Sequence, residues 1–320
     1  MNNISQRIHD AGIVPVVKIQ DAAKAGALAH SLLRGGLDCI EVTFRTATAA
    51  DSIAAICNDC PEMLVGAGTV LTCEQVNQAA EAGAKFIVTP GFNRKVVEYC
   101  LEKGLPVYPG CSDPSAIESG IELGLEILKF FPAEQLGGLK MIRALSGPYQ
   151  NVLFMPTGGI NENNLLEYLS FDRIAAVGGT WMVKEELIEN NRFDEITAIA
   201  RESVRKMLGF RLRHVGINCK DPNEAAKQAA LLAKMFDFDV KAGNSSDFAG
   251  TAFEFMKKPG FGTCGHICLE TNDISRAVAH LAKRGISIDE SGQKYDSKGC
   301  LHVVNLTDEV CGFGLQLINR

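Results

Sequence analysis

The chain has 320 residues, of which 46% are hydrophobic and 22% charged, a composition typical of folded globular proteins. Its 38 acidic and 32 basic residues give a formal net charge of −6, which argues against nucleic acid or an anionic membrane surface as a partner. No apolar run approaches the roughly 18 residues of a membrane span, and the eleven cysteines are scattered, so we expect a cytoplasmic protein with reduced thiols. A chain of this length favours two hydrophobic cores.

From residue 13 to about 207, short apolar runs alternate with helical patterns in which Gly follows as a stop signal. The apolar runs predict eight strands, at residues 13–17, 39–43, 63–67, 85–89, 106–109, 127–131, 152–156 and 174–178. Eight strand–helix units predict a closed (β/α)₈ barrel, a TIM barrel, over residues 1–209.

Residues 210–320 follow a different order, in which a strand and a helix precede several strands. The pattern that begins at His214 restarts 52 residues later at His266. We expect helices over 222–235 and 274–284, and strands near 213–217, 238–241, 251–256, 265–269, 300–306 and 312–318. The second domain is therefore predicted to be a smaller α+β unit built from two βαβββ repeats.

Lys129 lies in the second half of the sixth apolar run, where the carboxyl ends of barrel strands carry catalytic residues. Its apolar neighbours disfavour the charged ammonium, which makes the free amine available to attack a carbonyl carbon. We therefore expect Lys129 to form a Schiff base. The alternative is a structural ion pair with a carboxylate.

Glu41, Thr43 and Arg45 alternate along the second strand and so share one face. Both faces of a barrel strand are covered, so the two charged side chains need partners. We expect Glu41 to be the general acid/base and Arg45 to bind a substrate carboxylate, although a structural Glu41–Arg45 pair is the alternative. No histidine lies between His30 and His214, so proton transfer in the barrel must use a carboxylate, a lysine or water.

Glycine pairs follow two neighbouring strands of the predicted barrel. Gly158-Gly159 comes after the seventh strand and Gly178-Gly179 after the eighth, the place where barrels often bind phosphate through backbone N–H groups. We therefore expect an anion site there. Residues 66–69 and 89–91 bring further backbone and hydroxyl groups to the same rim.

Five motifs together resemble, in order and spacing, the class I aldolases of 2-keto-3-deoxy-6-phosphogluconate (KDPG), which also act on 4-hydroxy-2-oxoglutarate (KHG). The motifs are Glu41-Val42-Thr43-Phe44-Arg45-Thr46, Gly66-Ala67-Gly68-Thr69-Val70, Thr89-Pro90-Gly91, Leu128-Lys129-Phe130-Phe131-Pro132-Ala133-Glu134 and Thr157-Gly158-Gly159-Ile160. The resemblance covers roughly residues 8–207. Two departures are Phe44, where Leu is common, and Thr180, where Ser is common.

The resemblance implies a lyase that cleaves KDPG to pyruvate and glyceraldehyde 3-phosphate, as in the Entner–Doudoroff route of carbohydrate metabolism, and KHG to pyruvate and glyoxylate. It implies covalent chemistry on Lys129 without a cofactor, proton transfer by Glu41, and a homo-oligomer, commonly a trimer. It also implies substrate contacts by Arg45 and Thr69 at the carboxylate, Pro90 and Phe131 along the pocket, Thr157 beside the aldehyde, and Gly158, Gly159, Gly179 and Thr180 at the phosphate. The alternative functions are a phosphosugar epimerase or isomerase on the same barrel, and a keto-acid sensor that signals through the C-terminal domain.

The C-terminal domain resembles the vicinal oxygen chelate, or glyoxalase-like, fold. The positions that match the four metal ligands of that family are His214, Glu254, His266 and Gln316, a set that could hold a divalent ion. Gln316 stands where Glu is common, and the first repeat is short. We therefore favour a metal-free packing or ligand-binding module over a metal site.

Overall fold

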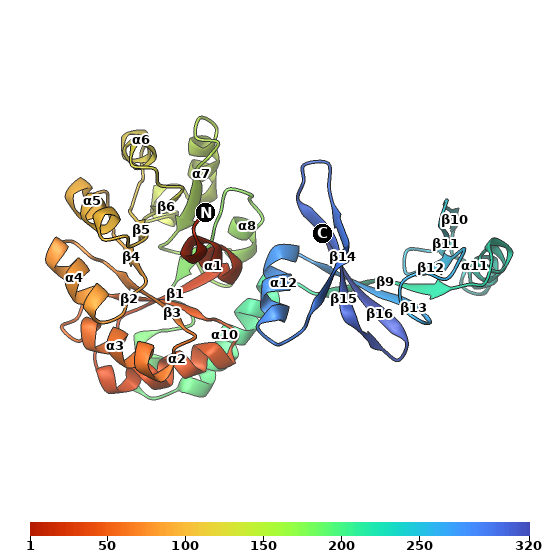
Figure 1. Ribbon diagram of the computed structural model, residues 1–320, viewed down its shortest axis with the longest axis horizontal. Coiled ribbons are helices and arrows are strands. Elements are labelled where there is room, and N and C mark those ends of the chain that lie inside the picture. Colours follow the sequence, from red (N-terminus) through yellow and green to blue (C-terminus); the bar gives the residue numbers. More distant parts are fainter. The chain divides into compact units, whose positions relative to one another are not determined.

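The computed structural model describes all 320 residues and divides them into two compact units, Met1–Met207 (unit 1) and Leu208–Arg320 (unit 2). Each unit has its own sheet system (Figure 1). Across the whole chain, no helix is both long enough and apolar enough to cross a membrane.

Unit 1 consists of parallel strands surrounded by helices (Figure 1). The strands are β1 (Ile13–Val17), β2 (Cys39–Thr43), β3 (Leu64–Gly68), β4 (Phe86–Val88), β5 (Val107–Tyr108), β6 (Ile127–Phe130), β7 (Leu153–Pro156) and β8 (Val177–Gly179). The helices are α1 (Asn3–Ala11), η1 (Ala22–Lys24), α2 (Ala25–Arg34), α3 (Ala49–Asp59), α4 (Cys73–Glu81), α5 (Arg94–Glu102), α6 (Pro114–Glu122), η2 (Glu134–Leu136), α7 (Gly138–Ser146), α8 (Leu165–Leu169), α9 (Glu185–Glu189) and α10 (Phe193–Leu208).

The eight strands close into a ring. Six of them pair in the order β5-β4-β3-β2-β1-β8, and β6 pairs with β7. Isolated bridges join the two groups, from Gly110 to Lys129 on one side and from Thr157 to Gly178 on the other. The eighth strand is regular only from residue 177, later than the predicted 174, because the chain bends at Ala175 after Ile174 forms an isolated bridge with Phe154.

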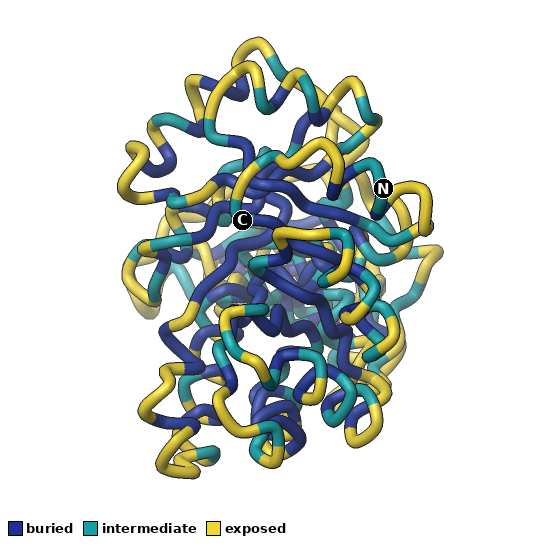
Figure 2. Tube along the Cα trace, turned by 90° about the vertical axis from the view of Figure 1, so that its left-hand side faces the viewer, coloured by how far each residue is buried: buried dark blue, intermediate teal, exposed yellow.

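The local sequence explains both the helices and the strands of unit 1. Asn2, Thr72, Asn93 and Asp113 each accept a backbone N–H with their side chain at the start of a helix, which satisfies a donor that the helix itself cannot pair. Strands β1, β2 and β3 are buried along their whole length, since helices cover one face and the barrel interior the other. Figure 2 shows this division between dark blue inner segments and yellow outer ones.

Helix α1 covers the amino-terminal end of the barrel. Its Ile8 and Ala11 belong to one buried cluster with Val14, Phe86 and Met155 from the strands. This packing fills the lower barrel, so a pocket among the strands can open only at their carboxyl ends.

Unit 2 contains two successive β-α-β-β-β repeats. Its elements are β9 (Arg211–Asn218), α11 (Pro222–Phe236), β10 (Val240–Ala242), β11 (Ser246–Ala249), β12 (Phe253–Met256), β13 (Gly265–Thr271), α12 (Ile274–Ala282), β14 (Ile288–Tyr295), β15 (Leu301–Val310) and β16 (Phe313–Asn319). All eight strands form one sheet in the order β10-β11-β12-β9-β13-β16-β15-β14. The first strands of the two repeats, β9 and β13, are antiparallel neighbours at its centre.

Two strands of unit 2 were not predicted from the sequence. β14 is an edge strand that is only partly buried and consists mainly of polar residues, so it carries no apolar signal. β11 has only four residues, Ser246–Ala249, with no β-branched side chain among them.

Candidate active site

The carboxyl ends of the barrel strands surround a pocket of about 270 Å³. It brings together all eleven residues predicted for the aldol reaction: Glu41, Arg45, Thr69, Pro90, Lys129, Phe131, Thr157, Gly158, Gly159, Gly179 and Thr180. Val16, Thr43, Ile160 and Gly178 complete the lining.

Lys129 lies on β6 and is almost fully buried, with 5% of its surface exposed. Its Nζ is 3.4 Å from Oε1 of Glu41 and 5.4 Å from the centre of the Phe131 ring. The pair combines a potential nucleophile with a potential proton acceptor at one point of the pocket. The structural ion pair and the chemical role considered for Lys129 are therefore compatible, since the same contact serves both.

Glu41 lies on β2, only 1% exposed, and Gly68 of the neighbouring strand β3 leaves room for it. A Cβ atom at Gly68 would lie 2.0 Å from Oε1 of Glu41, so no larger residue fits there without moving the carboxylate. The other oxygen, Oε2, is buried without a hydrogen-bond partner in the protein. A buried acceptor of this kind is available to a substrate group or a water molecule in the pocket.

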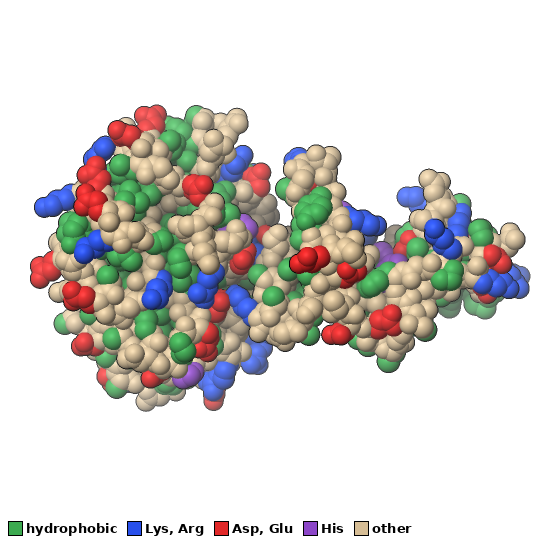
Figure 3. All heavy atoms as spheres, viewed as in Figure 1, with side chains coloured by type: hydrophobic (Ala, Val, Ile, Leu, Met, Phe, Trp, Pro, Cys, Tyr) green, Lys and Arg blue, Asp and Glu red, His purple; other side chains and the backbone are tan.

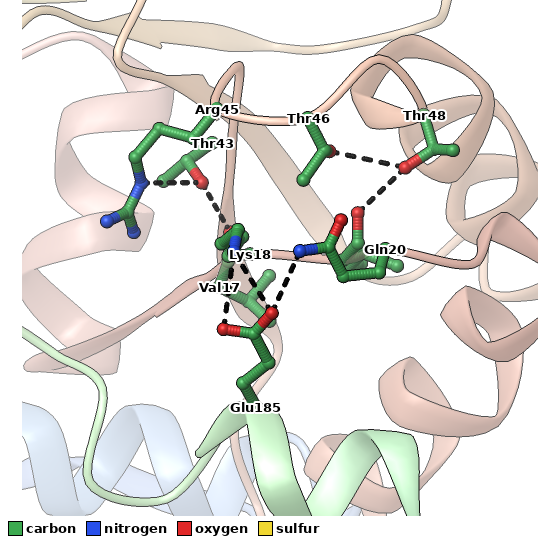
Figure 4. Close-up of polar contacts among 9 residues, drawn as sticks. Val17, Lys18, Gln20, Thr43, Arg45, Thr46, Thr48 and Glu185 are labelled. Atoms are coloured by element: carbon green, nitrogen blue, oxygen red, sulfur yellow. Dashed lines mark hydrogen bonds and ion pairs between the residues drawn. The ribbon is translucent and has the colours of Figure 1, made fainter.

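Arg45 is oriented by a short chain of hydrogen bonds. Its Nε donates to Oγ1 of Thr43 at 3.2 Å, and that hydroxyl donates to the backbone carbonyl of Val17 at 2.9 Å (Figure 4). The structural Glu41–Arg45 pair, considered as the alternative from the sequence, does not form, because Glu41 pairs with Lys129 instead. The terminal guanidinium nitrogens are left for a ligand.

Thr69 adopts a backbone conformation that is unfavourable for its residue type. Its φ is 56°, in the left-handed region, which β-branched residues rarely enter. Such strain, which costs of the order of 1–3 kcal/mol, is found mainly at functional sites. The residue lines the pocket, where its side chain faces the same cavity as Arg45.

Thr157 presents a second buried polar atom without a protein partner. Its Oγ1 makes no hydrogen bond, and a Cβ at the neighbouring Gly178 would lie 2.3 Å from it. The hydroxyl thus occupies the space that the glycine leaves, within the pocket lining. An unpaired buried hydroxyl costs free energy, which a substrate hydrogen bond would recover.

The glycine-rich ends of β7 and β8 form the remaining wall. Gly158 and Gly159 have φ values of 101° and 83°, which favour glycine, and the side chain of Glu134 fills the space beside Gly159. No hydrogen bond within the chain uses the N–H of Gly158, Gly159 or Thr180. Free N–H groups on neighbouring turns are suited to bind an anion.

A comparison with known protein families agrees with this geometry. The model of the KDPG and KHG aldolase family matches residues 4–199. The chain belongs to this family. Among curated proteins, the 2-dehydro-3-deoxy-phosphogluconate aldolase of Treponema pallidum is 46% identical over 205 residues, which are 64% of this chain and 98% of the relative. The KHG/KDPG aldolase of Escherichia coli is 41% identical over 192 residues, which are 60% of this chain and 90% of the relative.

Solved structures of KDPG aldolases match the same part of the chain. The enzyme of Legionella pneumophila, captured with pyruvate as a covalent carbinolamine, has 36% sequence identity and a TM-score of 0.61, and covers 63% of this chain and 98% of its own. The enzyme of Zymomonas mobilis with 3-phosphoglycerate has 36% identity and a TM-score of 0.59, with 63% and 95% of the two chains covered. The C-terminal third of this aldolase lies outside the family match.

In that third, unit 2, three of the four residues at the candidate ligand positions converge. Nε2 of His214 and Nε2 of His266 lie 3.1 and 3.4 Å from Oε2 of Glu254, and 3.0 Å from each other. The strand register explains the convergence, because Glu254 and His266 lie opposite Gly216 on either side of β9. A Cβ at Gly216 would lie 2.1 Å from the His266 ring, so the ring fits there only because residue 216 is a glycine.

The electrostatics of Glu254 are set by these contacts. Burial alone would raise the pKa of its carboxyl group, but hydrogen bonds from His214, His266 and Ser246 hold that pKa well below its ordinary value. Ser246 Oγ approaches Oε1 to 2.5 Å. Gln316, the fourth predicted position, donates to Oδ1 of Asn305 at 3.0 Å.

One polar cluster of the aldolase barrel was not predicted. Lys18, which follows β1, lies 3.0 Å from the carboxylate of Glu185 at the start of α9, and Gln20 donates to the same carboxylate at 2.9 Å (Figure 4). Lys18 and Glu185 are 167 residues apart in the chain, so no local pattern could have revealed the pair.

Proposed function

We propose that unit 1 is a class I aldolase, a carbon–carbon lyase that cleaves KDPG to pyruvate and glyceraldehyde 3-phosphate, and KHG to pyruvate and glyoxylate. The observation that carries this proposal is the buried Lys129–Glu41 pair, with 3.4 Å between Nζ and Oε1. The pair lies in a pocket that is lined by residues of the five aldolase motifs. Relatives at 41–46% identity are named for these substrates, and the Legionella enzyme holds pyruvate covalently.

The reaction begins at the 2-oxo carbon of the substrate. Glu41 takes a proton from the Lys129 ammonium, and the free amine adds to the carbonyl to give a carbinolamine. Loss of water, with a proton returned by Glu41, leaves a protonated Schiff base. The positive nitrogen then acts as the electron sink for the next step.

Cleavage follows when the Glu41 carboxylate, which has just returned its proton, removes the proton of the 4-hydroxyl group. The C3–C4 bond breaks, its electron pair moves into the Schiff base to form an enamine, and the aldehyde leaves. Glu41 protonates C3 of the enamine, and water releases pyruvate and restores Lys129. The unpaired Oε2 of Glu41 supports its role in these transfers.

The remaining pocket residues suit the two ends of the substrate. Arg45 and Thr69 would bind the carboxylate, since the Arg45 guanidinium has no carboxylate partner in the protein. The unpaired Thr157 hydroxyl would meet the reacting oxygen of the aldehyde. The free N–H groups at Gly158, Gly159 and Thr180, together with Gly179, would bind the phosphate, with Pro90 and Phe131 lining the space between.

A steady-state assay with purified protein tests this function. KDPG should give pyruvate and glyceraldehyde 3-phosphate in equal amounts, and Lys129→Met should abolish the reaction. Release of no pyruvate, or full activity of the variant, would refute the proposal. A phosphosugar epimerase or isomerase would convert substrate without cleavage, and a sensor would bind pyruvate without turnover, so the same assay separates these alternatives.

For unit 2 we propose a second function, the binding of a divalent metal ion by His214, Glu254 and His266 in a glyoxalase-like fold. Support comes from the two βαβββ repeats in one sheet and from three ligand atoms that lie within 4.8 Å of one another. Two imidazoles and a carboxylate suit ions such as Zn²⁺ or Mn²⁺. Ser246 would orient the carboxylate through its hydrogen bond to Oε1 of Glu254. The sequence favoured a metal-free module, whereas the convergence of these three side chains favours a metal site.

Metal analysis of the full-length protein tests the second function. We expect about one equivalent of a divalent ion in the native protein, and a loss of that ion in the variant His214→Ala. Aldol cleavage should survive chelation, because the residues proposed for cleavage need no metal. A protein that takes up no Zn²⁺ or Mn²⁺ when titrated would refute the metal site.

The partner that the pocket supports is a small-molecule substrate. Acidic and basic side chains are interspersed over the face of unit 1 drawn in Figure 3, without a single-signed patch on that face. The homotrimer that the family resemblance implies stays a prediction, which light scattering on the purified protein would check.

A further inference from the structure

Arg45 is the charged residue of the pocket that lacks an opposite charge. Its Nε donates to Thr43, and no carboxylate of the chain forms an ion pair with its guanidinium. A free guanidinium can form a bidentate pair with any carboxylate that reaches it. Binding of a substrate carboxylate therefore depends on keeping the carboxylates of the protein away.

Glu185 is the carboxylate that could compete. It is partly exposed, with 46% of its side chain accessible, so its conformation is not fixed by packing. Its pKa is lowered first by hydrogen bonds from Gln20 and Lys18, and also by the positive charges of Lys18 and Arg45. Arg45 and Glu185 both lie beside the end of β1, where Figure 4 draws them around Val17 and Lys18.

Two side chains from the end of β1 hold Glu185 in place. Nζ of Lys18 lies 3.0 and 3.4 Å from its two carboxylate oxygens, and Nε2 of Gln20 lies 2.9 Å from Oε1 (Figure 4). Lys18 comes directly after Val17, whose carbonyl accepts the hydroxyl of Thr43. The residues that orient Arg45 and those that hold Glu185 are thus anchored on the same strand end.

We propose that Lys18, assisted by Gln20, is a positioning residue that holds Glu185 away from Arg45 and so keeps Arg45 free for the substrate carboxylate. This inference rests on the proposed aldolase function. Without Lys18, the Glu185 carboxylate turns to Arg45 and competes with the substrate from within the same molecule.

A double-mutant cycle with Lys18→Met, Glu185→Gln and their combination tests the proposal. Pyruvate is the first probe, because it carries the carboxylate but no phosphate; the readout is the pyruvate concentration that gives half-maximal inactivation by borohydride. The second readout is kcat and KM for KDPG. Both side chains are partly exposed, so the variants should fold like the native protein.

We expect Lys18→Met to raise the half-saturating pyruvate concentration and the KM for KDPG by about two- to fivefold, the competition expected from a partly exposed ion pair between Glu185 and Arg45. The kcat value of Lys18→Met should change little. In Glu185→Gln, the half-saturating pyruvate concentration and the KM for KDPG should stay within about twofold of the native values. In the double variant, both quantities should return to near the native values. A double variant as weak as Lys18→Met, or unaltered pyruvate binding in Lys18→Met, would overturn the proposal. A native protein that pyruvate and borohydride do not inactivate would instead refute the aldolase function itself.

Discussion

Replacement of Gly68 by alanine should disable the proton transfers of Glu41 without disturbing the fold. The alanine Cβ would lie 2.0 Å from Oε1 of Glu41 and 2.6 Å from its Cδ, whereas ordinary contacts begin near 3.4 Å. The backbone at Gly68 lies outside the left-handed region, so alanine fits the main chain. The whole effect therefore falls on the position of the carboxylate.

The size of the effect follows from this overlap. The carboxylate must shift by roughly 1.4 Å, and a displacement of about 1 Å commonly costs about 100-fold in rate. That factor corresponds to about 2.7 kcal/mol of lost transition-state stabilisation. We therefore expect kcat for KDPG to fall about 100-fold, with a smaller change in KM.

Exchange of the pyruvate methyl protons for deuterium, followed by NMR, measures the proton transfer alone. Gly91→Ala is the matched control, because it lies at the same rim and its Cβ would meet no atom within 4 Å. The exchange rate should fall about 100-fold in Gly68→Ala and stay nearly unchanged in Gly91→Ala. Native exchange in Gly68→Ala would refute the assignment of proton transfer to Glu41.

Three further predictions concern other parts of the molecule. Thr157→Val should lower kcat/KM for KDPG by about tenfold or more. It should leave the free energy of unfolding equal or higher, because the hydroxyl has no partner in the protein, and a loss of stability in urea unfolding would contradict this. Gly159→Ala, whose Cβ would lie 2.4 Å from Cγ of Glu134, should raise KM for KDPG about tenfold but not for KHG, which has no phosphate, and equal effects on both substrates would argue against a phosphate site. Because the pKa of Glu254 is lowered from 4.5 on folding, the unfolded chain binds the proton first, so the free energy of unfolding should fall as the pH drops below 4.5. Glu254→Gln should flatten this fall in urea unfolding of the metal-free protein, and an unchanged slope would refute the assignment.

The sequence predicted the chemical centre well because barrel topology converts linear order into proximity. The ends of parallel strands meet at one rim, so Lys129 on β6 and Glu41 on β2 approach to 3.4 Å although 88 residues separate them. The glycine pairs after β7 and β8 follow the same rule. Such residues are found from strand ends alone.

Contacts that depend on side-chain reach could not be predicted in this way. The Lys18–Glu185 pair joins a strand end to a helix start, and neither residue stands out in its local sequence. Gly68 was expected only to bring backbone groups to the rim, and its role as the space for Glu41 depends on the register of β2 against β3. In unit 2, polar β14 was missed because an exposed edge strand needs no apolar pattern.

Reduction of the native protein by borohydride in the presence of pyruvate, followed by peptide mass spectrometry, tests the central claim most directly. We predict one reduced pyruvyl adduct per chain, located on Lys129, with loss of KDPG cleavage in proportion to labelling. The Lys129→Met variant should take up no label. An adduct on another lysine, or full activity after complete reduction, would contradict the assignment of Lys129 as the nucleophile.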